Sequence, residues 1–262
     1  MATILDTIAA YARERVAADK REVSLDTLKA MCRERGPADG FPFEAALRRG
    51  GLGFICEVKR ASPSKGLIAP DFPYIEIARD YEKAGAACIS CLTEPKWFLG
   101  SDQIFADIRT AISIPMLRKD FVVDEYQLYQ ARLMGADCVL LICAILDGDT
   151  IKRYLDICEE LGLSALVEAH DEAEVASAIA AGARMIGVNN RNLKDFSVDT
   201  ENSRRLRDMV PRSVLFVSES GVGTVEDIRL LKAAGVDAVL VGETLMRAAD
   251  KTAKLAELRG AV

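Results

Sequence analysis

A single histidine, His170, is present among the 262 residues, and this scarcity excludes several kinds of active site. A metal site with several histidine ligands is excluded, and we find no other cluster of metal-ligating residues, so we expect no metal. A histidine-based catalytic triad is disfavoured as well, because His170 follows Glu168 in a predicted loop, where we interpret it as an ordinary loop residue. Acid–base chemistry then falls to lysine and glutamate.

Positive charge is also in short supply. Lysine and arginine number 34 against 40 aspartates and glutamates, a net charge of −6. Nucleic-acid-binding proteins usually carry a basic face, so we expect no nucleic-acid partner. No apolar run reaches the ~18 residues of a membrane span. The N-terminal segment MATILDTIAAYARERV carries acids and has no apolar core of a signal peptide. We therefore expect neither a signal peptide nor a membrane partner.

The seven cysteines do not form a recognisable framework. Cys88 and Cys91 have the spacing of a CxxC motif, but C-I-S-C lies within a strand-like apolar run, as do Cys56, Cys138 and Cys143. Unpaired cysteine behaves as a small core hydrophobe, so we interpret these residues as buried, reduced thiols. This interpretation indicates a reducing compartment, and we expect a cytoplasmic protein.

A short phrase recurs five times along the chain, each time a glycine followed by β-branched and aliphatic residues. The five phrases are KAGAACISCL, LMGADCVLLI, ELGLSALVEA, AAGARMIGVN and AAGVDAVLVG. Glycine just after a helix adopts the left-handed conformation that ends the helix. The apolar runs that follow are typical of parallel strands buried on both faces. The repeat length of ~25 residues is that of one strand–helix unit.

The weaker runs complete a set of eight strands, which predicts a (β/α)8 TIM barrel. The expected strands span residues 53–59, 86–92, 114–118, 137–143, 163–168, 184–189, 213–218 and 237–242. An open, doubly wound sheet is the alternative, but it would more often show a glycine-rich fingerprint after its first strand. Charged residues stand there instead, and we find no nicotinamide fingerprint.

Residues 1–49 precede the first strand and contain two amphipathic patterns, TILDTIAAYARERVAADK and SLDTLKAMCRER, the second with Ser24 as its N-cap. A barrel requires neither helix. We expect an N-terminal helical extension that packs on the barrel, and a single domain over residues 1–262 without a second barrel.

Charged and polar residues gather where the predicted strands end, which is where barrels of this class carry their chemistry. These residues are Glu57, Lys59, Lys119, Glu168, Asn189, Arg191 and Glu219. Glu57 and Lys59 have the same parity in the first strand, so both can face the barrel axis, whereas Arg60 has the opposite parity and is interpreted as structural. We therefore expect a charged pocket at one mouth of the barrel.

The last two strands run into glycine and then into a helix, in SESGVGTVEDI and VLVGETLMRAA. Glycine lets a ligand approach the backbone, and the free amides at a helix N-terminus favour an anion. These two loops form the usual phosphate site of TIM barrels. They predict a phosphate-bearing substrate.

Several stretches together resemble the indole-3-glycerol phosphate synthase family of tryptophan biosynthesis. They are EVKRASPSKG, LTEPKWFLGS, PMLRKDFVVDEYQLYQARLMGADCVLLI, LVEAHDE, IGVNNRNL, VSESGV and VLVGETLMR, in order from about residue 50 onward. The resemblance implies a (β/α)8 barrel with an N-terminal helical extension. It also implies a carbon–carbon lyase that uses no cofactor and converts 1-(2-carboxyphenylamino)-1-deoxyribulose 5-phosphate to indole-3-glycerol phosphate, carbon dioxide and water.

The resemblance also implies roles for individual residues. Lys119 resembles the general acid of ring closure, Glu168 the general base, and Lys59 a second acid with Glu57 beside it. Asn189 would hold a substrate hydroxyl and Arg191 the carboxylate, while Glu219 and Ser62 would order the site. The amides of Ser220, Gly221, Gly242 and Glu243 would bind the phosphate, with Lys59 nearby. The remaining expected contacts are the ring walls Phe121, Leu140 and Leu193, and the lid Trp97 and Phe98.

Two positions depart from the family pattern. Trp97 stands where many relatives have a smaller aromatic residue, which puts the packing of the lid in doubt. Glu243 stands where several relatives have serine, and a carboxylate would repel the phosphate. We expect only the amide of Glu243 to take part and its side chain to turn away from the site.

Three other functions remain open from the residues alone. A class I aldolase would use Lys119 or Lys59 as a Schiff-base nucleophile. Phosphoribosylanthranilate isomerase shares the phosphate loops but lacks EVKRASPSKG and LRKDF. A phosphate-sensing scaffold would have little use for several desolvated charges. The expected partner is a sugar-phosphate substrate, and we expect a monomer or weak homodimer.

Overall fold

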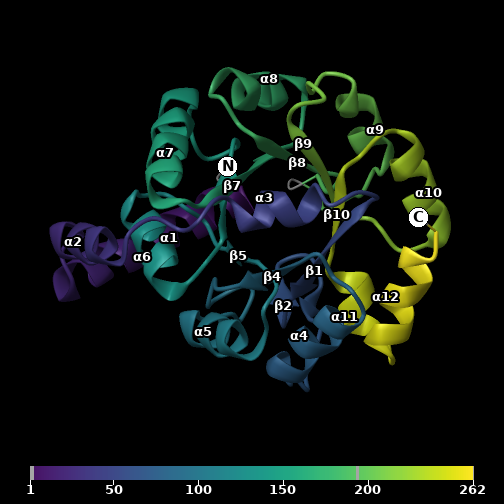
Figure 1. Cartoon of the computed structure of the whole chain (residues 1–262), viewed down its shortest axis with the longest axis horizontal. Coiled ribbons are helices and arrows are strands. Elements are labelled where there is room, and N and C mark those ends of the chain that lie inside the picture. The colour runs from purple at the N-terminus through teal and green to yellow at the C-terminus, as the bar shows by residue number, and fades with distance from the viewer. Residues whose placement is uncertain (1–2, 193–194, 262) are drawn as a thin grey trace.

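Eight parallel strands close into a barrel in the computed structural model, which describes residues 3–192 and 195–261 (Figure 1). Around the barrel the strand order is β1-β10-β9-β8-β7-β6-β5-β4. The strands are β1 (Gly53–Val58), β4 (Cys88–Leu92), β5 (Met116–Lys119), β6 (Cys138–Ile142), β7 (Ser164–Ala169), β8 (Met185–Asn189), β9 (Leu215–Glu219) and β10 (Ala238–Val241). Each overlaps one of the eight predicted strands, so the predicted TIM barrel is confirmed.

Helices follow the strands and cover the outside of the barrel (Figure 1). They are α4 (Tyr74–Lys83), α5 (Asp102–Ala111), α6 (Tyr126–Met134), α7 (Gly148–Leu161), α8 (Glu172–Ala180), α9 (Glu201–Arg207), α10 (Val225–Ala233), α11 (Glu243–Arg247) and α12 (Lys251–Arg259). Gly135 and Gly162 end α6 and α7 in the left-handed conformation, with φ of 84° and 70°. The glycines of the recurring phrase therefore end helices, as predicted.

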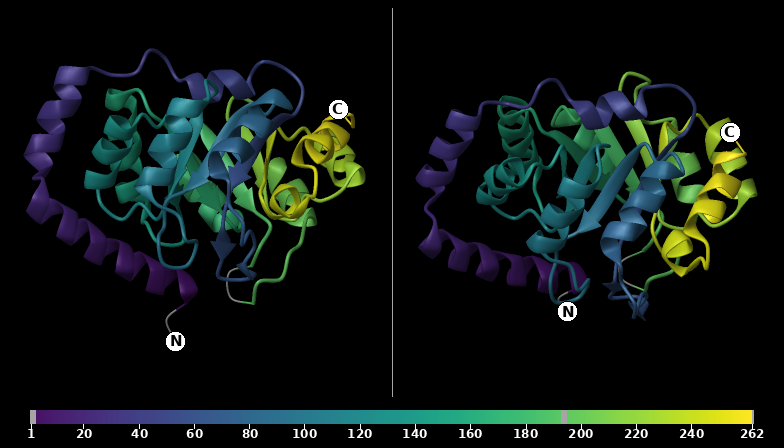
Figure 2. Two further views of the ribbon diagram at one scale, coloured as in Figure 1. Left: turned by 90° about the horizontal axis from the view of Figure 1, so that it is seen from below. Right: turned by 60° about the horizontal axis from the view of Figure 1, so that its bottom comes forward.

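The N-terminal extension runs along the barrel from one of its ends to the other. It consists of α1 (Ile4–Glu22), α2 (Leu25–Arg35), capped by Ser24 as predicted, and α3 (Pro42–Leu47), which the sequence analysis missed. Figure 2 shows α1 at the end of the barrel that carries the short hairpin of β2 (Ala61–Ser62) and β3 (Gly66–Leu67), α2 along the side, and α3 at the opposite end. Phe43 and Leu47 of α3 are buried against the lower barrel interior and close that end.

The charged segment EVKRASPSKG forms more structure than a loop. After β1 it folds into a short antiparallel hairpin of β2 (Ala61–Ser62) and β3 (Gly66–Leu67), which the sequence did not reveal. The amide of Ala61 donates to the carbonyl of Phe98 in the loop after β4, at 3.2 Å. The hairpin is thereby attached to the neighbouring strand's loop at the barrel mouth.

All seven cysteines are unpaired, and six are buried while Cys143 is partly buried. Burial raises the pKa of the Cys143 and Cys158 thiols to about 12, so both stay protonated and unreactive near neutral pH. The predicted burial is confirmed for Cys56, Cys88, Cys91 and Cys138, and Cys143 is partly buried. No helix in residues 3–192 and 195–261 is long and apolar enough to cross a membrane.

Candidate active site

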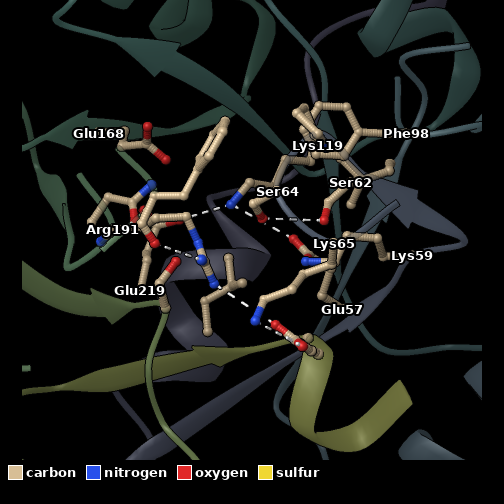
Figure 3. Close-up of a pocket in the computed structure, with 18 of the residues that line it drawn as sticks. Glu57, Lys59, Ser62, Ser64, Lys65, Phe98, Lys119, Glu168, Arg191 and Glu219 are labelled. Carbon is tan, nitrogen blue, oxygen red and sulfur yellow. Dashed lines mark hydrogen bonds and ion pairs between the residues drawn. The ribbon is translucent and has the colours of Figure 1, made fainter. Parts of the chain in front are cut away.

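A cavity of about 590 Å³ opens at the C-terminal ends of the barrel strands. Figure 3 shows the labelled side chains of Glu57, Lys119, Glu168 and Glu219 gathered around one space. Most of the residues predicted for the site line this cavity: Glu57, Lys59, Ser62, Phe98, Lys119, Phe121, Leu140, Glu168, Asn189, Arg191, Glu219, Ser220, Gly221, Gly242 and Glu243. Leu193 lies outside the described residues, and Trp97 is treated below.

Two lysines and two glutamates form an alternating chain of charge at the centre of the cavity. Lys59 Nζ lies 2.6 Å from Glu57 Oε1, and the other oxygen of Glu57 lies 3.7 Å from Lys119 Nζ. Lys119 Nζ in turn lies 2.7 Å from Glu219 Oε2. Each ammonium therefore faces a carboxylate. The chain joins β1, β5 and β9, so it exists only because the barrel closes.

The charge pattern sets the protonation states. Burial alone would lower the pKa of Lys119, but the carboxylates of Glu219, Glu57 and Glu168 outweigh burial and raise that pKa above its ordinary value. Burial likewise opposes ionisation of Glu57, yet Lys59 and Lys119 lower its pKa. Three carboxylates surround the ammonium, so Lys119 stays charged near neutral pH.

Glu219 is a carboxyl group whose pKa is raised from its ordinary value to near neutral pH. Burial raises its pKa to about 7, Lys119 opposes this shift, and Glu168 adds to it. Its Oε1 atom is buried and has no hydrogen-bond partner among the described residues. Glu219 therefore changes charge near neutral pH beside the Lys119 ammonium, a property that the sequence did not indicate.

Two glycines make room for the carboxylates. A Cβ atom at Gly187 of β8 would lie 2.1 Å from Glu219 Oε1. A Cβ at Gly242, after β10, would lie 2.4 Å from Glu57 Oε1. Neither glycine has a positive φ, so the requirement is space rather than backbone conformation. The sequence analysis placed Gly242 in the phosphate site for its backbone and did not identify Gly187.

The loop after β4 is organised by one buried carboxylate. Glu94 is fully buried and accepts hydrogen bonds from the amides of Lys96, Trp97 and Phe98 at 3.0, 2.7 and 2.9 Å. This arrangement presents Phe98 to the cavity, where the centroid of its ring lies 6.4 Å from the ring centroid of Phe121. The sequence analysis quoted Glu94 but assigned it no role.

Trp97 is not brought into the cavity, so its expected role in a lid over the substrate needs correction. Trp97 is not one of the described residues that line the cavity. Its ring packs edge-on against Tyr11 of α1, with centroids 5.5 Å apart, and Lys96 Nζ lies 4.8 Å from the Trp97 centroid. The indole group therefore docks this loop onto the N-terminal extension.

The extension also contributes to the cavity itself. Ile4, Leu5 and Ile8 of α1 line it on the apolar side. Arg15 of α1 makes two hydrogen bonds to the buried carboxylate of Asp120, at 2.7 and 3.2 Å, directly after Lys119. The sequence showed an amphipathic helix, which is compatible with any apolar neighbour, so this contribution could not be anticipated.

The loops after β9 and β10 differ in how their amides are used. Ser220 and Gly221 both have positive φ, 66° and 83°, which is uncommon for serine and turns this loop toward the cavity. Helix α10 begins with a capping box, in which the Thr224 hydroxyl accepts the amide of Asp227 and the Asp227 carboxylate accepts the amides of Gly223 and Thr224. Helix α11 follows Gly242 and has no side-chain cap. Because the Asp227 carboxylate already lies at the start of α10, the Ser220 turn and the start of α11 suit an anion better.

The side chain of Glu243 does not turn away, contrary to our expectation. Its carboxylate lies 3.6 Å from Lys65 Nζ and 3.8 Å from Arg191 Nη2, and both of these residues line the cavity. Arg247 also pairs with it, at 3.1 Å. Three surrounding cations compensate the negative charge, which explains why the carboxylate lies at the cavity edge.

A closed barrel with two lysine–glutamate pairs and two backbone loops suited to an anion defines a barrel enzyme that performs acid–base chemistry on an anionic small molecule. A model of the indole-3-glycerol phosphate synthase family matches residues 5–258. The indole-3-glycerol phosphate synthase of Ruminiclostridium cellulolyticum is 59% identical over 257 residues, 98% of this chain and 99% of the relative. The one from Endomicrobium trichonymphae is 51% identical over 256 residues, 98% and 99% of the two chains.

Among solved structures, thiamine phosphate pyrophosphorylase from Pyrococcus furiosus superimposes with a TM-score of 0.61 at 20% identity, covering 80% of this chain and 95% of that one. This likeness shows the barrel fold alone. The chain belongs to the indole-3-glycerol phosphate synthase family. The activity predicted from the sequence, a carboxy-lyase step of tryptophan biosynthesis that acts on a sugar phosphate, is thereby confirmed.

Proposed function

We propose that the alternating chain from Lys59 to Glu219 carries out the ring closure, decarboxylation and dehydration of 1-(2-carboxyphenylamino)-1-deoxyribulose 5-phosphate. The observation that supports this most directly is the position of Lys119, an ammonium held 2.7 Å from Glu219 and 3.7 Å from Glu57 inside the cavity. Ring closure breaks the aromaticity of the substrate, so the carbonyl oxygen must gain a proton as it is attacked. A buried, charged lysine suits that step.

The remaining steps are divided among the other charged residues. Glu168 acts as the general base and Lys59 as the acid that assists loss of water, with Glu57 as the shared partner of both lysines. Asn189 holds a substrate hydroxyl, and Arg191 meets the substrate carboxylate. Each well-placed acid or base contributes about 10²–10⁴-fold to the rate. The reaction proposed here uses no cofactor.

Glu219 has a further role that its titration supports. With a pKa of about 7 it exchanges a proton near neutral pH, and it lies in contact with Lys119. We therefore assign to Glu219 the ordering of Lys119 and the return of its proton between turnovers. Ser62, which lies 3.4 Å from Ser64 by their hydroxyl oxygens, supports the β2–β3 side of the site.

The phosphate binds at the Ser220 turn and the start of α11, through the amides of Ser220, Gly221, Gly242 and Glu243, with Lys59 nearby. Thr244 supports this assignment, because its hydroxyl donates to the carbonyl of Val222 at 2.7 Å and ties the two loops together. The aromatic ring of the substrate lies between Phe121, Phe98 and Leu140, and Leu193 completes this wall.

A class I aldolase is the competing reaction on the same barrel. A Schiff-base lysine must lose its proton to act as a nucleophile, and the carboxylates around Lys119 raise its pKa. This observation favours a role as proton donor. We also propose that the chain is a single-domain monomer or weak homodimer, and that it works in the cytoplasm, where unpaired cysteines remain reduced.

The test is a fluorescence assay for the indole product, on the unaltered protein and on Lys119→Ala. We expect product from the former and a loss of at least ~100-fold in the latter. Equal rates from the unaltered protein and Lys119→Ala would show that Lys59, and not Lys119, is the acid of ring closure. Absence of product from the unaltered protein, together with a borohydride-trapped adduct of a sugar phosphate, would replace the synthase by the aldolase.

A further inference from the structure

The single histidine lies directly behind the proposed general base. His170 follows β7 by one residue, and its Nε2 atom lies 3.6 Å from Glu168 Oε1. This nitrogen is buried and has no hydrogen-bond partner among the described residues. The separation is too long for a direct hydrogen bond and short enough for a strong charge interaction. The unpartnered nitrogen therefore faces the carboxylate that the reaction needs.

The other side of the imidazole ring is held by Glu174 at the start of α8. One oxygen of Glu174 lies 3.0 Å from His170 Nδ1 and accepts the backbone amide of the same residue at 2.7 Å. Asn202 of α9 donates to the His170 carbonyl at 3.0 Å. The ring is thus oriented by Glu174, and two further hydrogen bonds fix the backbone of His170, which exceeds what an ordinary loop residue requires.

A ring between two carboxylates favours the doubly protonated form. With a proton on Nδ1 for Glu174, a neutral ring would present a lone pair to Glu168, whereas the imidazolium presents an N–H. The ionisable groups that face His170 are Glu168 on β7, Glu174 on α8, Glu219 on β9 and, beside Glu174, the thiol of Cys143. None of these is a cation. Burial opposes the charge, but Glu174 and Glu168 outweigh burial and raise the pKa of His170.

We propose that His170 is a positioning residue whose imidazolium attracts the Glu168 carboxylate and holds it oriented for proton abstraction. The proposal rests on the role assigned above to Glu168. It replaces the interpretation of His170 as an ordinary loop residue. His170 is not among the described residues that line the cavity, so it acts through Glu168, which does line it.

The direct test does not need activity. Because the chain has one histidine, the two carbon-bound protons of its ring give one pair of NMR signals, whose titration belongs to His170 without further assignment. We expect a midpoint above the ordinary value of about 6.5, and a lower midpoint in both Glu168→Gln and Glu174→Gln. A midpoint that Glu168→Gln leaves unchanged would overturn the pairing, whatever the product assay shows.

The second test separates charge from packing. In His170→Asn, kcat/KM should fall about tenfold more at pH 6 than at pH 9, since the charge is lost only where the imidazolium existed. A purely structural role would lower activity by one factor at every pH, and this result would contradict the proposal. Glu174→Gln is the matched variant, expected to shift the acidic limb in the same direction by a smaller amount.

Stability supplies a control that is independent of the reaction. Because the folded-state pKa of His170 is raised, its contribution to the free energy of unfolding is full below the ordinary pKa and is lost as pH rises through the raised one. The stability difference between the unaltered protein and His170→Asn should therefore be larger at pH 5 than at pH 9. An equal difference at both pH values would show an uncharged ring and overturn the proposal.

Discussion

The barrel interior has two layers with opposite character, built from the same strands. In the lower layer Ile55, Leu117, Leu166 and Val217 are buried in one apolar cluster that α3 closes. Two residues further along each of these strands stand Glu57, Lys119, Glu168 and Glu219, which face the cavity. Side chains two apart point to the same side of a strand. Each of these strands therefore supplies one side chain to the apolar core and, two residues later, one side chain to the active-site cavity.

The difference between the layers lies in what surrounds them. Apolar side chains gain free energy from burial wherever they pack. A buried ammonium or carboxylate gains only if its partner lies within a few ångströms. The lower layer therefore tolerates many combinations of similar volume, whereas the upper layer depends on distances across strands that only the closed barrel provides.

The largest effect on stability should come from the lower layer. Leu117→Ala removes a fully buried side chain two residues before Lys119, and we expect the free energy of unfolding to fall by about 2–5 kcal/mol. For the folded fraction, kcat should stay within severalfold of its original value. Urea unfolding and the indole product assay measure the two quantities. A large loss of kcat with little loss of stability would contradict the division of the barrel interior into a lower layer for stability and an upper layer for catalysis.

The space beside Glu219 offers the next test. Gly187→Ala places a Cβ atom 2.1 Å from Glu219 Oε1, closer than two non-bonded atoms can lie, so the carboxylate must shift from its present position beside Lys119. Since small displacements of reacting groups are costly, we expect kcat to fall by about 10–100-fold. Gly148→Ala is the control, because its Cβ would meet only the Ser177 hydroxyl, at 3.3 Å. Comparable losses in both variants would point to general damage to the fold.

Glu219 should also be visible in the pH dependence of kcat/KM. Its pKa of about 7 lies above the ordinary value, so the carboxylate that orders Lys119 is present above pH 7 and is lost below it. We expect kcat/KM to rise with pH through about 7. This step should vanish in Glu219→Gln and persist in His170→Asn. A step that survives in Glu219→Gln belongs to another group.

The smallest effect should come from the cavity edge. Glu243→Gln removes a partly exposed negative charge near the proposed phosphate site, and partly exposed ion pairs contribute only about 0.2–1 kcal/mol. We expect KM to fall about two- to fivefold with kcat unchanged. The difference should shrink as salt is added, because salt screens exposed charges. An increase in KM would instead assign the carboxylate a part in substrate binding.

The repeat of glycine and apolar run predicted five of the barrel strands, and the repeat length together with weaker apolar runs predicted the other three, because these signals are local. Strand parity likewise predicted that Glu57 and Lys59 share a face. Other features could not be predicted in this way. Trp97 turns to Tyr11 because α1 lies there, and these two residues are far apart in the chain. Glu94 accepts the amides of residues only two to four positions ahead, but this arrangement depends on how the irregular loop after β4 closes, and such a loop has no repeating pattern.

By itself the sequence determined the barrel, the family and the residue types at its mouth, since period, glycine position and motif are properties of short segments. The tertiary structure decided which charges meet and hence which protons are held. Lys119 and Glu219 are 100 residues apart in the chain and 2.7 Å apart in the cavity. The carboxylates of Glu219, Glu57 and Glu168 keep Lys119 charged. Burial and the charge of Glu168 raise the pKa of Glu219 to about 7 although Lys119 opposes this shift, because a pKa depends on burial and on neighbouring charge.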